Sequence, residues 1–424
     1  MSSDLYQIQI VDGLPQLYQF DDGLPRLEIL SPGETLTPDG ANYLLKDSHG
    51  LYVEVKVLTP IPVLAGSPEV FYVSSQYYTD PAGVVIPNSG ESDDQGSDDQ
   101  GSDDQGSDDE QEDGPSSGDD SYYGDNGDNS RSGLTGNDVY HGYAGRDNFN
   151  GDDGSDYLDG GSDDDDLNGG GDDDSLFGGD GNDHLNGGTG NDFLDGGSGN
   201  DQADGGEGDD QFVGGHGEGN DRYNGGGGTD EVTFTSALAG IAVDLQRGTA
   251  GSRGVDDAGI GADRLTSIEN VVAGEHDDLL IGSAVANVLD GRGGDDRIDG
   301  GRGADTSIGG TGADLFVISK ASDTGLGSRA DQIIDFSGFG GDGDQIDLSG
   351  IDAKKGFTRR DAFRFLDAAP VASGEGSNGV IWFDAGQGCV FASTDKDVQA
   401  EFAIRVLGVT DMSAADFVGL APPV

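Results

Sequence analysis

Short runs of alternating apolar and polar residues occur near the start of the chain. They lie at Tyr6–Val11, Leu51–Val57 and Val70–Val73. Alternation with a period of two is typical of β-strands with one buried face. Turn-forming dipeptides that contain glycine separate the runs. We therefore predict a small β-rich domain over residues 1–86.

A different pattern begins at Gly133, where one large apolar residue recurs at every ninth position. Units such as GGDGNDHLN and GGTGNDFLD follow one another to Val213, an eleven-residue unit covers 214–224, and the nine-residue frame resumes at 225. Position eight of each unit is the apolar one. It is occupied by Tyr140, Phe149, Leu158, Leu167, Leu176, Leu185, Leu194, Ala203, Phe212, Tyr223 and Val232. This spacing predicts one short strand per unit over residues 131–233, each with one inward-facing side chain.

Glycine and aspartate hold fixed places in the same unit, G-G-x-G-x-D-x-U-x, where U is the apolar residue. Glycines at positions one, two and four permit a tight turn whose backbone carbonyls are left without strand partners. Position six adds a carboxylate. The residues are Asp138, Asp147, Asp156, Asp165, Asp174, Asp183, Asp192, Asp201, Asp210, Asp221 and Asp230. Carbonyl and carboxylate oxygens are the ligands that calcium prefers, so a turn is half a calcium site and its neighbour the other half.

A second, shorter array covers residues 273–317. Its position-six residues are Asp278, Asn287, Asp296, Asp305 and Asp314. Asn287 lacks the charge, so we expect its site to be weak or missing, and Ser307 is a polar residue at position eight. Residues 234–272 between the arrays alternate without a nonapeptide. We predict a β insertion there that continues the stack.

Composition points to a cation as the partner. The 424-residue chain has 83 acidic and 21 basic residues and a formal net charge of −62. Such a charge excludes nucleic acid and anionic membranes as expected partners, since both require basic patches. The sequence has one cysteine and no apolar run long enough for a membrane span. Residues 87–130, with their SDDQG repeats, are predicted to be an acidic disordered linker.

The thin core has a consequence for folding. One large apolar side chain per nine residues does not offset the conformational entropy that those residues lose on folding. Calcium must supply the difference, so binding and folding should be one event. Magnesium suits such a site less well because it demands octahedral geometry and retains its water. The five histidines are scattered, which argues against a zinc site.

The G-G-x-G-x-D-x-U-x units resemble the calcium-binding nonapeptides of the RTX (repeats-in-toxin) family. The region from about residue 270 onward resembles the C-terminal domain of serralysin-type metalloproteases, through ADQIIDFSGFGGDGDQIDLSGI at 330–351, FAIRVLGV at 402–409 and SAADFV at 413–418. The resemblance implies a parallel β-roll with two nonapeptides per coil. It also implies that Asp183 with Asp201, and Asp192 with Asp210, share calcium ions.

The second resemblance implies export. Proteins with this C-terminal domain carry an uncleaved C-terminal signal for an ATP-driven type I exporter. The first residues, MSSDLYQIQIVDG, lack the features of a cleavable signal peptide. We therefore expect a secreted, extracellular protein exported through its C-terminal region.

Residues 318–424 are predicted to form a C-terminal β domain with short helices. Strands are expected at Gln332–Phe336, Val380–Phe383, Val390–Ser393 and Phe402–Leu407, and helices at 359–366 and 414–418. The fold class is thus all-β, with two calcium-loaded roll arrays.

No catalytic constellation is visible. The sequence has no H-E-x-x-H, and residues 1–86 contain one histidine, His49, and no cysteine. We favour a non-enzymatic extracellular or cell-surface protein in which residues 1–86 bind a surface, glycan or matrix component. Two alternatives stay open: an enzyme with its activity in residues 1–86, or a roll that is itself the function as a calcium-responsive structural element.

Overall fold

The computed structural model describes residues 117–421, apart from 216–218, 255–257, 339, 355–360, 371–377, 396 and 398, and the backbone of strands β1 to β9. The chain divides into two compact units, Met1–Asp108 and Asp109–Val424. Among the described strands, no sheet contains members of both units. Most of the predicted linker at 87–130 lies outside the described residues.

The first unit contains two antiparallel sheets. One has the order β3-β2-β1-β7, with β1 (Tyr6–Val11), β2 (Leu14–Asp21), β3 (Leu24–Glu28) and β7 (Val70–Val73). The other has the order β4-β5-β6-β8-β9, with β4 (Thr35–Asp39), β5 (Asn42–Lys46), β6 (Tyr52–Val55), β8 (Tyr78–Thr79) and β9 (Val85–Ile86). The three strands predicted from alternation correspond to β1, β6 and β7.

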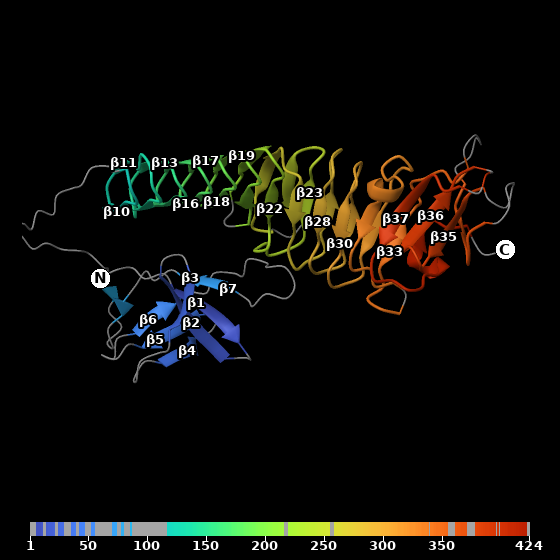
Figure 1. Cartoon of the computed structure of the whole chain (residues 1–424), viewed down its shortest axis with the longest axis horizontal. Helices are drawn as coiled ribbons and strands as arrows, with labels where there is room; N and C mark the ends of the chain where they lie inside the picture. The colour runs from blue at the N-terminus through green and yellow to red at the C-terminus, as the bar shows by residue number, and fades with distance from the viewer. Residues whose placement is uncertain are drawn as a thin grey trace, which may run out of the picture. The chain divides into compact units, whose positions relative to one another are not determined.

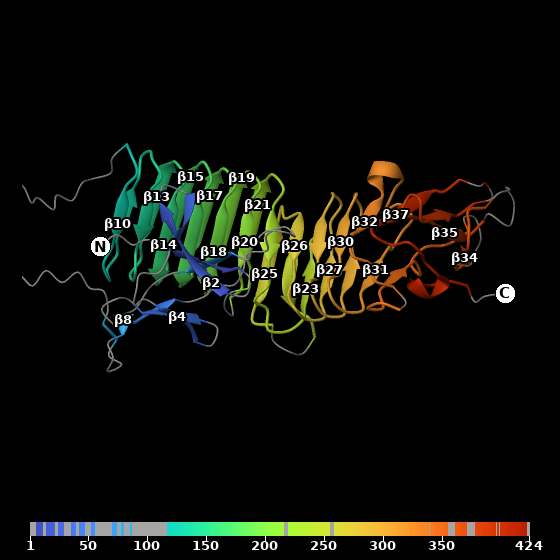
Figure 2. The same cartoon turned by 60° about the horizontal axis from the view of Figure 1, so that its bottom comes forward.

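The second unit is a parallel β-roll of two facing sheets, as predicted (Figures 1 and 2). One sheet begins with β10 (Ser121–Tyr123), β12 (Val139–His141), β14 (Tyr157–Ser162), β16 (Ser175–Asp180), β18 (Phe193–Ser198), β20 (Gln211–Val213) and β22 (Glu231–Thr233). It continues through β26 (Asn270–Val272), β28 (Val288–Asp290), β30 (Thr306–Ile308) and β32 (Asp331–Ile333).

The opposite sheet takes the alternate strands. It contains β11 (Ser130–Ser132), β13 (Asn148–Asp153), β15 (Asp166–Gly171), β17 (His184–Thr189), β19 (Gln202–Glu207), β21 (Arg222–Gly227) and β25 (Ala262–Thr266). Beyond the insertion it continues with β27 (Leu279–Ile281), β29 (Arg297–Asp299), β31 (Leu315–Val317), β33 (Gln345–Asp347) and β38 (Phe417–Val418). Strands β10 and β11 show that the stack begins before residue 131.

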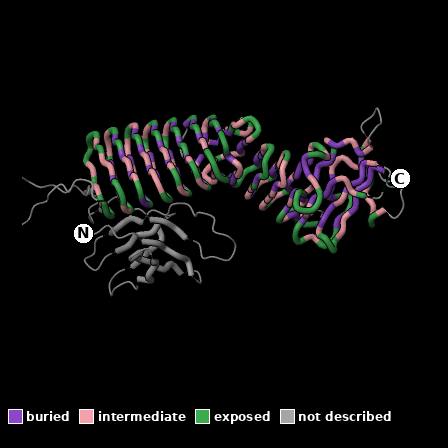
Figure 3. Tube along the Cα trace, turned by 45° about the horizontal axis from the view of Figure 1, so that its top comes forward, coloured by how far each residue is buried: buried purple, intermediate pink, exposed green. Residues whose placement is uncertain are grey.

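One regular coil of the roll is two nonapeptides long, so strands β10 to β18 each pair with the strand eighteen residues later. Leu158 lies opposite Leu176, and Leu176 opposite Leu194. All three are fully buried between the sheets, and the colouring of Figure 3 shows buried residues recurring along every coil. The inward position-eight residues therefore form one continuous narrow core, as the periodicity predicted.

The insertion continues the stack on one side, as predicted. Strands β23 (Ile241–Asp244) and β24 (Thr249–Ser252) form an antiparallel hairpin. β24 also pairs with β25, and β23 pairs in parallel with β27. One sheet thus gains two strands that the opposite sheet lacks, because β22, β26 and β28 follow one another directly there.

The C-terminal end of the roll is closed by an antiparallel meander. β37 (Phe402–Val406) pairs in parallel with β32 and antiparallel with β36 (Cys389–Ser393), which pairs with β35 (Val380–Asp384). The strand predicted at Gln332–Phe336 corresponds to β32, and those at Val380–Phe383, Val390–Ser393 and Phe402–Leu407 correspond to β35, β36 and β37. A 3₁₀ turn, η1 (Gly327–Arg329), precedes β32.

One of the two predicted helices is wrong. Within 359–366, residues 361–366 are described, and Arg364–Leu366 forms β34, which pairs with β35. Pairing with β35 and complete burial of Phe363 in the core outweigh local helix propensity here. The other expected helix is a single 3₁₀ turn, η2 (Ala414–Asp416), with Ser413 as its N-cap, and Phe417 then enters β38.

Candidate calcium sites

Two files of buried aspartates run along the two edges of the roll, one residue per coil in each. The first file contains Asp138, Asp156, Asp174, Asp192, Asp210 and Asp230, followed by Asn287 and Asp305. The second file contains Asp147, Asp165, Asp183, Asp201 and Asp221, followed by Asp278, Asp296 and Asp314. Every one of these side chains is at most 4% exposed. The structure thus stacks every second position-six residue, coil on coil, so that residues eighteen or twenty apart in the first array become neighbours.

One oxygen of each carboxylate is used to join neighbouring coils. The backbone N–H of Asp174 donates to Oδ1 of Asp192 at 2.8 Å, and that of Asp192 donates to Oδ1 of Asp210 at 2.9 Å. In the second file the N–H of Asp183 donates to Oδ1 of Asp201 at 2.8 Å. The pairs that the RTX resemblance implied, Asp183 with Asp201 and Asp192 with Asp210, are therefore in direct contact.

The other carboxylate oxygen is buried and has no protein partner. This holds, among the described residues, for Oδ2 of Asp138, Asp147, Asp156, Asp165, Asp174, Asp183, Asp192, Asp210, Asp230, Asp296, Asp305 and Asp314. A buried, unpartnered carboxylate oxygen carries a large desolvation cost that a cation removes. The recurrence of this arrangement along both files indicates a built feature of the fold.

Glycine leaves space around each unpartnered oxygen. A Cβ on the position-one residue Gly169 would overlap Oδ2 of Asp174 and come within 2.7 Å of the carbonyl oxygen of Gly187, one coil further on. At position four, Gly199 has φ of +131°, and a Cβ there would overlap the carbonyl oxygen of Gly181 in the preceding coil. Carboxylate and carbonyl oxygens thus face the same glycine-lined spaces between coils.

Electrostatics oppose the ionised state of these carboxylates when no cation is present. Burial, assisted by neighbouring aspartates, raises the pKa of Asp174 to about 8 and that of Asp296 to about 9. The same cause raises the pKa of Asp156 to about 7 and that of Asp192 to about 6. A divalent cation would reverse this penalty by placing two positive charges between the carboxylates. Hard oxygen donors in a carbonyl-rich setting fit calcium.

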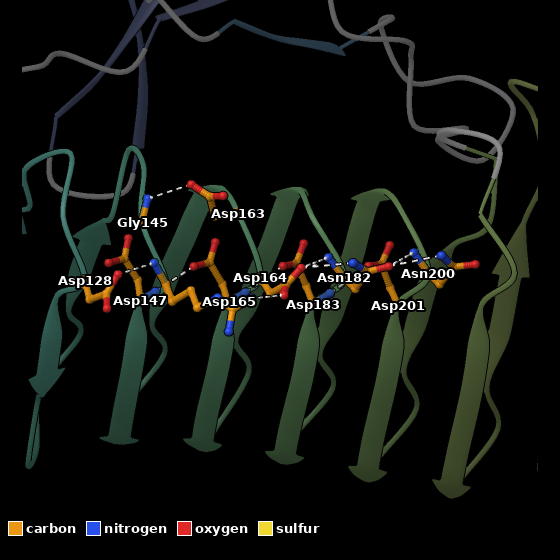
Figure 4. A network of polar contacts seen from close by, with 11 residues as sticks. Asp128, Gly145, Asp147, Asp163, Asp164, Asp165, Asn182, Asp183, Asn200 and Asp201 are labelled. Atoms are coloured by element: carbon orange, nitrogen blue, oxygen red, sulfur yellow. Dashed lines mark hydrogen bonds and ion pairs between the residues drawn. The ribbon is translucent and has the colours of Figure 1, made fainter.

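A second ladder, at position five, lies on the outside of the same turns. The N–H of Asn182 donates to Oδ1 of Asp164 at 3.0 Å, and the N–H of Asn200 donates to Oδ1 of Asn182 at 3.1 Å (Figure 4). These bonds run toward the preceding coil, whereas those of Asp183 and Asp201 run toward the following one. Adjacent side chains therefore tie each turn to both neighbours.

Sequence reasoning missed three members of the files. Asp263 lies in the insertion, is 2% exposed, accepts from the N–H of Asp221 at 3.0 Å and has an unpartnered Oδ2. Asp331 accepts from the N–H of Asp305, and Asp344 from that of Asp314. The signal was an aspartate two residues before a buried apolar residue. It occurs in AGIGADRLT at 258–266, where alanine replaces the first glycine, and in the two Asp-Gln-Ile strings at 331–333 and 344–346.

Some residues of the files differ from this pattern. Oδ2 of Asp221 accepts from the Tyr223 hydroxyl at 3.1 Å. Both carboxylate oxygens of Asp278 accept backbone N–H groups, from Ile241 at 2.7 Å and Gly274 at 3.1 Å. Asn287 has both ends of its amide bonded within the protein. The protein satisfies these side chains without an ion.

Other groups in the described residues do not assemble a comparable site. His141 and His184 each contact one aspartate, and His276 bonds to backbone carbonyls. His49 and His216 lie outside the described residues. Asp395, Asp397 and Glu401 bring carboxylate oxygens within 4.8 Å of one another, but two of the three are exposed. The described residues include no helix long and apolar enough to cross a membrane.

Comparison with known families agrees with the geometry. Residues 132–167, 159–194, 186–218 and 195–232 match the RTX calcium-binding nonapeptide repeat, and residues 222–419 match the peptidase M10 serralysin C-terminal family. The chain carries RTX calcium-binding nonapeptide repeats and a serralysin-type C-terminal domain. RTX repeats bind calcium ions, so calcium is the cofactor of the roll. The combination fits a secreted substrate of type I export, and both matched regions are non-catalytic parts of such proteins.

No curated protein matches this chain significantly. A solved structure that matches is the AlgE6R3 subunit of the mannuronan C5-epimerase from Azotobacter vinelandii, at 19% identity, with 52% of this chain and 78% of that chain covered and a TM-score of 0.20. A TM-score of this size does not indicate a shared overall arrangement.

Proposed function

We propose that the two aspartate files hold calcium ions between successive coils, and that filling them folds the roll. The observation that supports this is the unpartnered, buried Oδ2 that recurs along both edges. Each ion would be held by carboxylates and turn carbonyls of adjacent coils, with Asp263, whose Oδ2 is also unpartnered, extending the sites that the nonapeptides begin. Calcium tolerates the irregular, oxygen-only surroundings that such turns offer.

Folding should wait until the protein meets calcium outside the cell. At low calcium the net charge of −62 repels the chain, and the buried carboxylates oppose the compact state. Calcium in the extracellular medium binds the folded state alone and so stabilises it. The chain would therefore cross the exporter unfolded and fold on arrival, with residues 318–424 carrying the export signal.

The extracellular role that we propose is binding without catalysis. Residues 1–86 would recognise a surface, glycan or matrix component, and the acidic segment at 87–130 would act as a tether that lets the module reach its target. The alternative is an enzyme whose activity lies in residues 1–86. Binding of the full chain, but not of a chain lacking 1–86, to a glycan or matrix array would support the first role. Absence of any bound component would contradict it.

The calcium assignment is tested by exchanging one carboxylate for an amide. Asp192→Asn removes the charge beside a proposed ion, whereas Asp195→Asn makes the same change three residues away, where Oδ1 accepts from the N–H of Gly197. Equilibrium dialysis with calcium should show fewer ions bound to the Asp192→Asn chain and an unchanged number in the control. Equal numbers in both chains would contradict the assignment.

A further inference from the structure

The coil formed by residues 273–290 is the exception to the calcium pattern. It is the first coil of the second array, and its strand β27 pairs with β23 of the hairpin. It contributes Asp278 to the second file and Asn287 to the first, and both are buried. The nonapeptide motif would assign a calcium site to Asp278.

The carboxylate of Asp278 is already satisfied by the protein. Oδ1 accepts from the N–H of Ile241 at 2.7 Å, and Oδ2 accepts from the N–H of Gly274 at 3.1 Å. Asp296, one coil later in the same file and equally buried, has an unpartnered Oδ2. The two aspartates therefore occupy equivalent places in the roll but have opposite bonding states.

The positively charged side chain of Arg253 also contacts Asp278. Nη1 of Arg253, immediately after β24, donates to the backbone carbonyl of Asp278 at 2.6 Å. The N–H of Arg253 donates to the carbonyl of Gly240 at 2.6 Å, which fixes the base of that side chain against β23. The guanidinium is thus held beside a carbonyl that also accepts from the N–H of Arg297.

The positive charge of Arg253 also acts on the carboxyl group of Asp278, where it opposes a rise of the pKa. Burial raises the pKa of Asp278 to about 6, while the two N–H donors and Arg253 oppose the rise.

On the opposite edge of this coil, the side-chain amide of Asn287 is also fully bonded within the protein. Nδ2 of Asn287 donates to the carbonyl of Glu269 at 2.6 Å, and its Oδ1 accepts from the N–H of Ser283 at 2.7 Å. The amide N–H thus donates to a backbone carbonyl of the preceding coil, on the same edge of the roll. No unpartnered carboxylate oxygen is found at either position of this coil.

We propose that the coil of residues 273–290 binds no calcium, because the Arg253 guanidinium and the Asn287 amide take the place of the ions on its two edges. Arg253 is a positioning residue that stabilises Asp278. The coil is a metal-free connection between the first array and the calcium-loaded remainder of the second. This inference rests on the proposed function, since it assumes calcium in the neighbouring coils.

Anomalous diffraction from crystals of the full chain grown with calcium tests the proposal directly. Peaks are expected beside Asp296, Asp305 and Asp314, with none beside Asp278 or Asn287. A peak beside Asp278 would overturn the inference and leave the proposed function intact. The absence of peaks along both files would overturn the proposed function itself.

Matched variants give a test in solution. Asp278→Asn should bind as many calcium ions per chain as the native protein, whereas Asp296→Asn should bind fewer. Arg253→Met should bind the native number, or one more if calcium enters where the guanidinium was. A loss of bound calcium in Asp278→Asn or Arg253→Met would contradict the metal-free coil.

Discussion

The two carboxylate oxygens of a buried aspartate in this roll have different roles. Oδ1 of Asp192 accepts the N–H of Asp174 and so fixes the spacing of two coils, while Oδ2 has no protein partner. The protein alone satisfies Oδ1, whereas Oδ2 needs a cation. Replacement by asparagine would keep the Oδ1 acceptor but lose the charge, which is why the amide is a suitable probe.

The position-one glycines should be as sensitive as the aspartates. In Gly169→Ala the added methyl would overlap Oδ2 of Asp174. We expect fewer bound calcium ions and a higher calcium concentration at the folding midpoint. Gly171→Ala, in the same strand, is the control, because its Cβ would meet no atom closer than 3.6 Å. Similar calcium titrations of the two variants would contradict the proposed cradle.

Raised carboxyl pKa values predict a pH dependence for the calcium-free roll. The pKa of Asp174 is about 8 and that of Asp296 about 9 in the folded state, against ordinary values near 3.8. A pKa raised by folding means that the protonated form stabilises the fold. This contribution is complete below the unfolded pKa and is lost as the pH rises through the folded pKa. In a calcium chelator, circular dichroism should therefore show more β structure at about pH 5 than at about pH 8, and the reverse order would contradict this account.

At the scale of the element, the nonapeptide frame predicted the strands of the roll well because two independent periodic signals coincide in it. The apolar residue at position eight and the aspartate at position six are two apart, which places one in the core and the other in the turn. Asp331 and Asp344 keep this two-residue spacing without the full set of glycines, and alanine replaces the first glycine in the unit of Asp263, so the strict motif missed all three. Asp278 keeps the full motif position, yet its bonding to Ile241 and Gly274 depends on contacts that no local pattern encodes.

The predicted helix at 359–366 shows another limit of local patterns. Residues Arg364–Leu366 pair with a strand that lies more than a dozen positions later. Burial of Phe363 and that long-range pairing decide the structure, and neither is visible in a short window of sequence.

A core substitution should affect folding without removing ions. Leu185 in β17 is fully buried at position eight. Leu185→Ala should cost about 2–5 kcal/mol of folding free energy, and calcium binding is coupled to that folding. We expect a higher calcium midpoint by circular dichroism with an unchanged number of bound ions at saturation. His184→Ala, at the exposed neighbouring position, should leave both unchanged, and a loss of ions in Leu185→Ala would contradict the separation of core and site.

At the scale of the whole molecule, the roll and the C-terminal β strands form one continuous stack, since β37 pairs directly with β32. The sequence predicted this region through its resemblance to serralysin-type domains. Three strands of residues 1–86, β1, β6 and β7, were predicted too, but the chemistry of that unit is not encoded in any motif, so its partner remains a proposal.

Export gives a test at this scale. Removing residues 318–424 should abolish secretion through a type I exporter, because the proposed signal lies there. The truncated chain should instead accumulate inside the producing cell, as measured by immunoblotting of cells and medium. A chain lacking residues 1–86 is the control and should be secreted normally. Secretion of the C-terminal truncation at the native level would contradict the assignment of the signal.

The central claim is that calcium binding and folding of the roll are one event. Far-UV circular dichroism of the full chain during a calcium titration, with magnesium in a parallel titration, tests it most directly. The account predicts a cooperative change from coil to β structure with calcium and no comparable change with magnesium. A roll that is already folded in a calcium chelator at neutral pH, or that responds equally to magnesium, would contradict it.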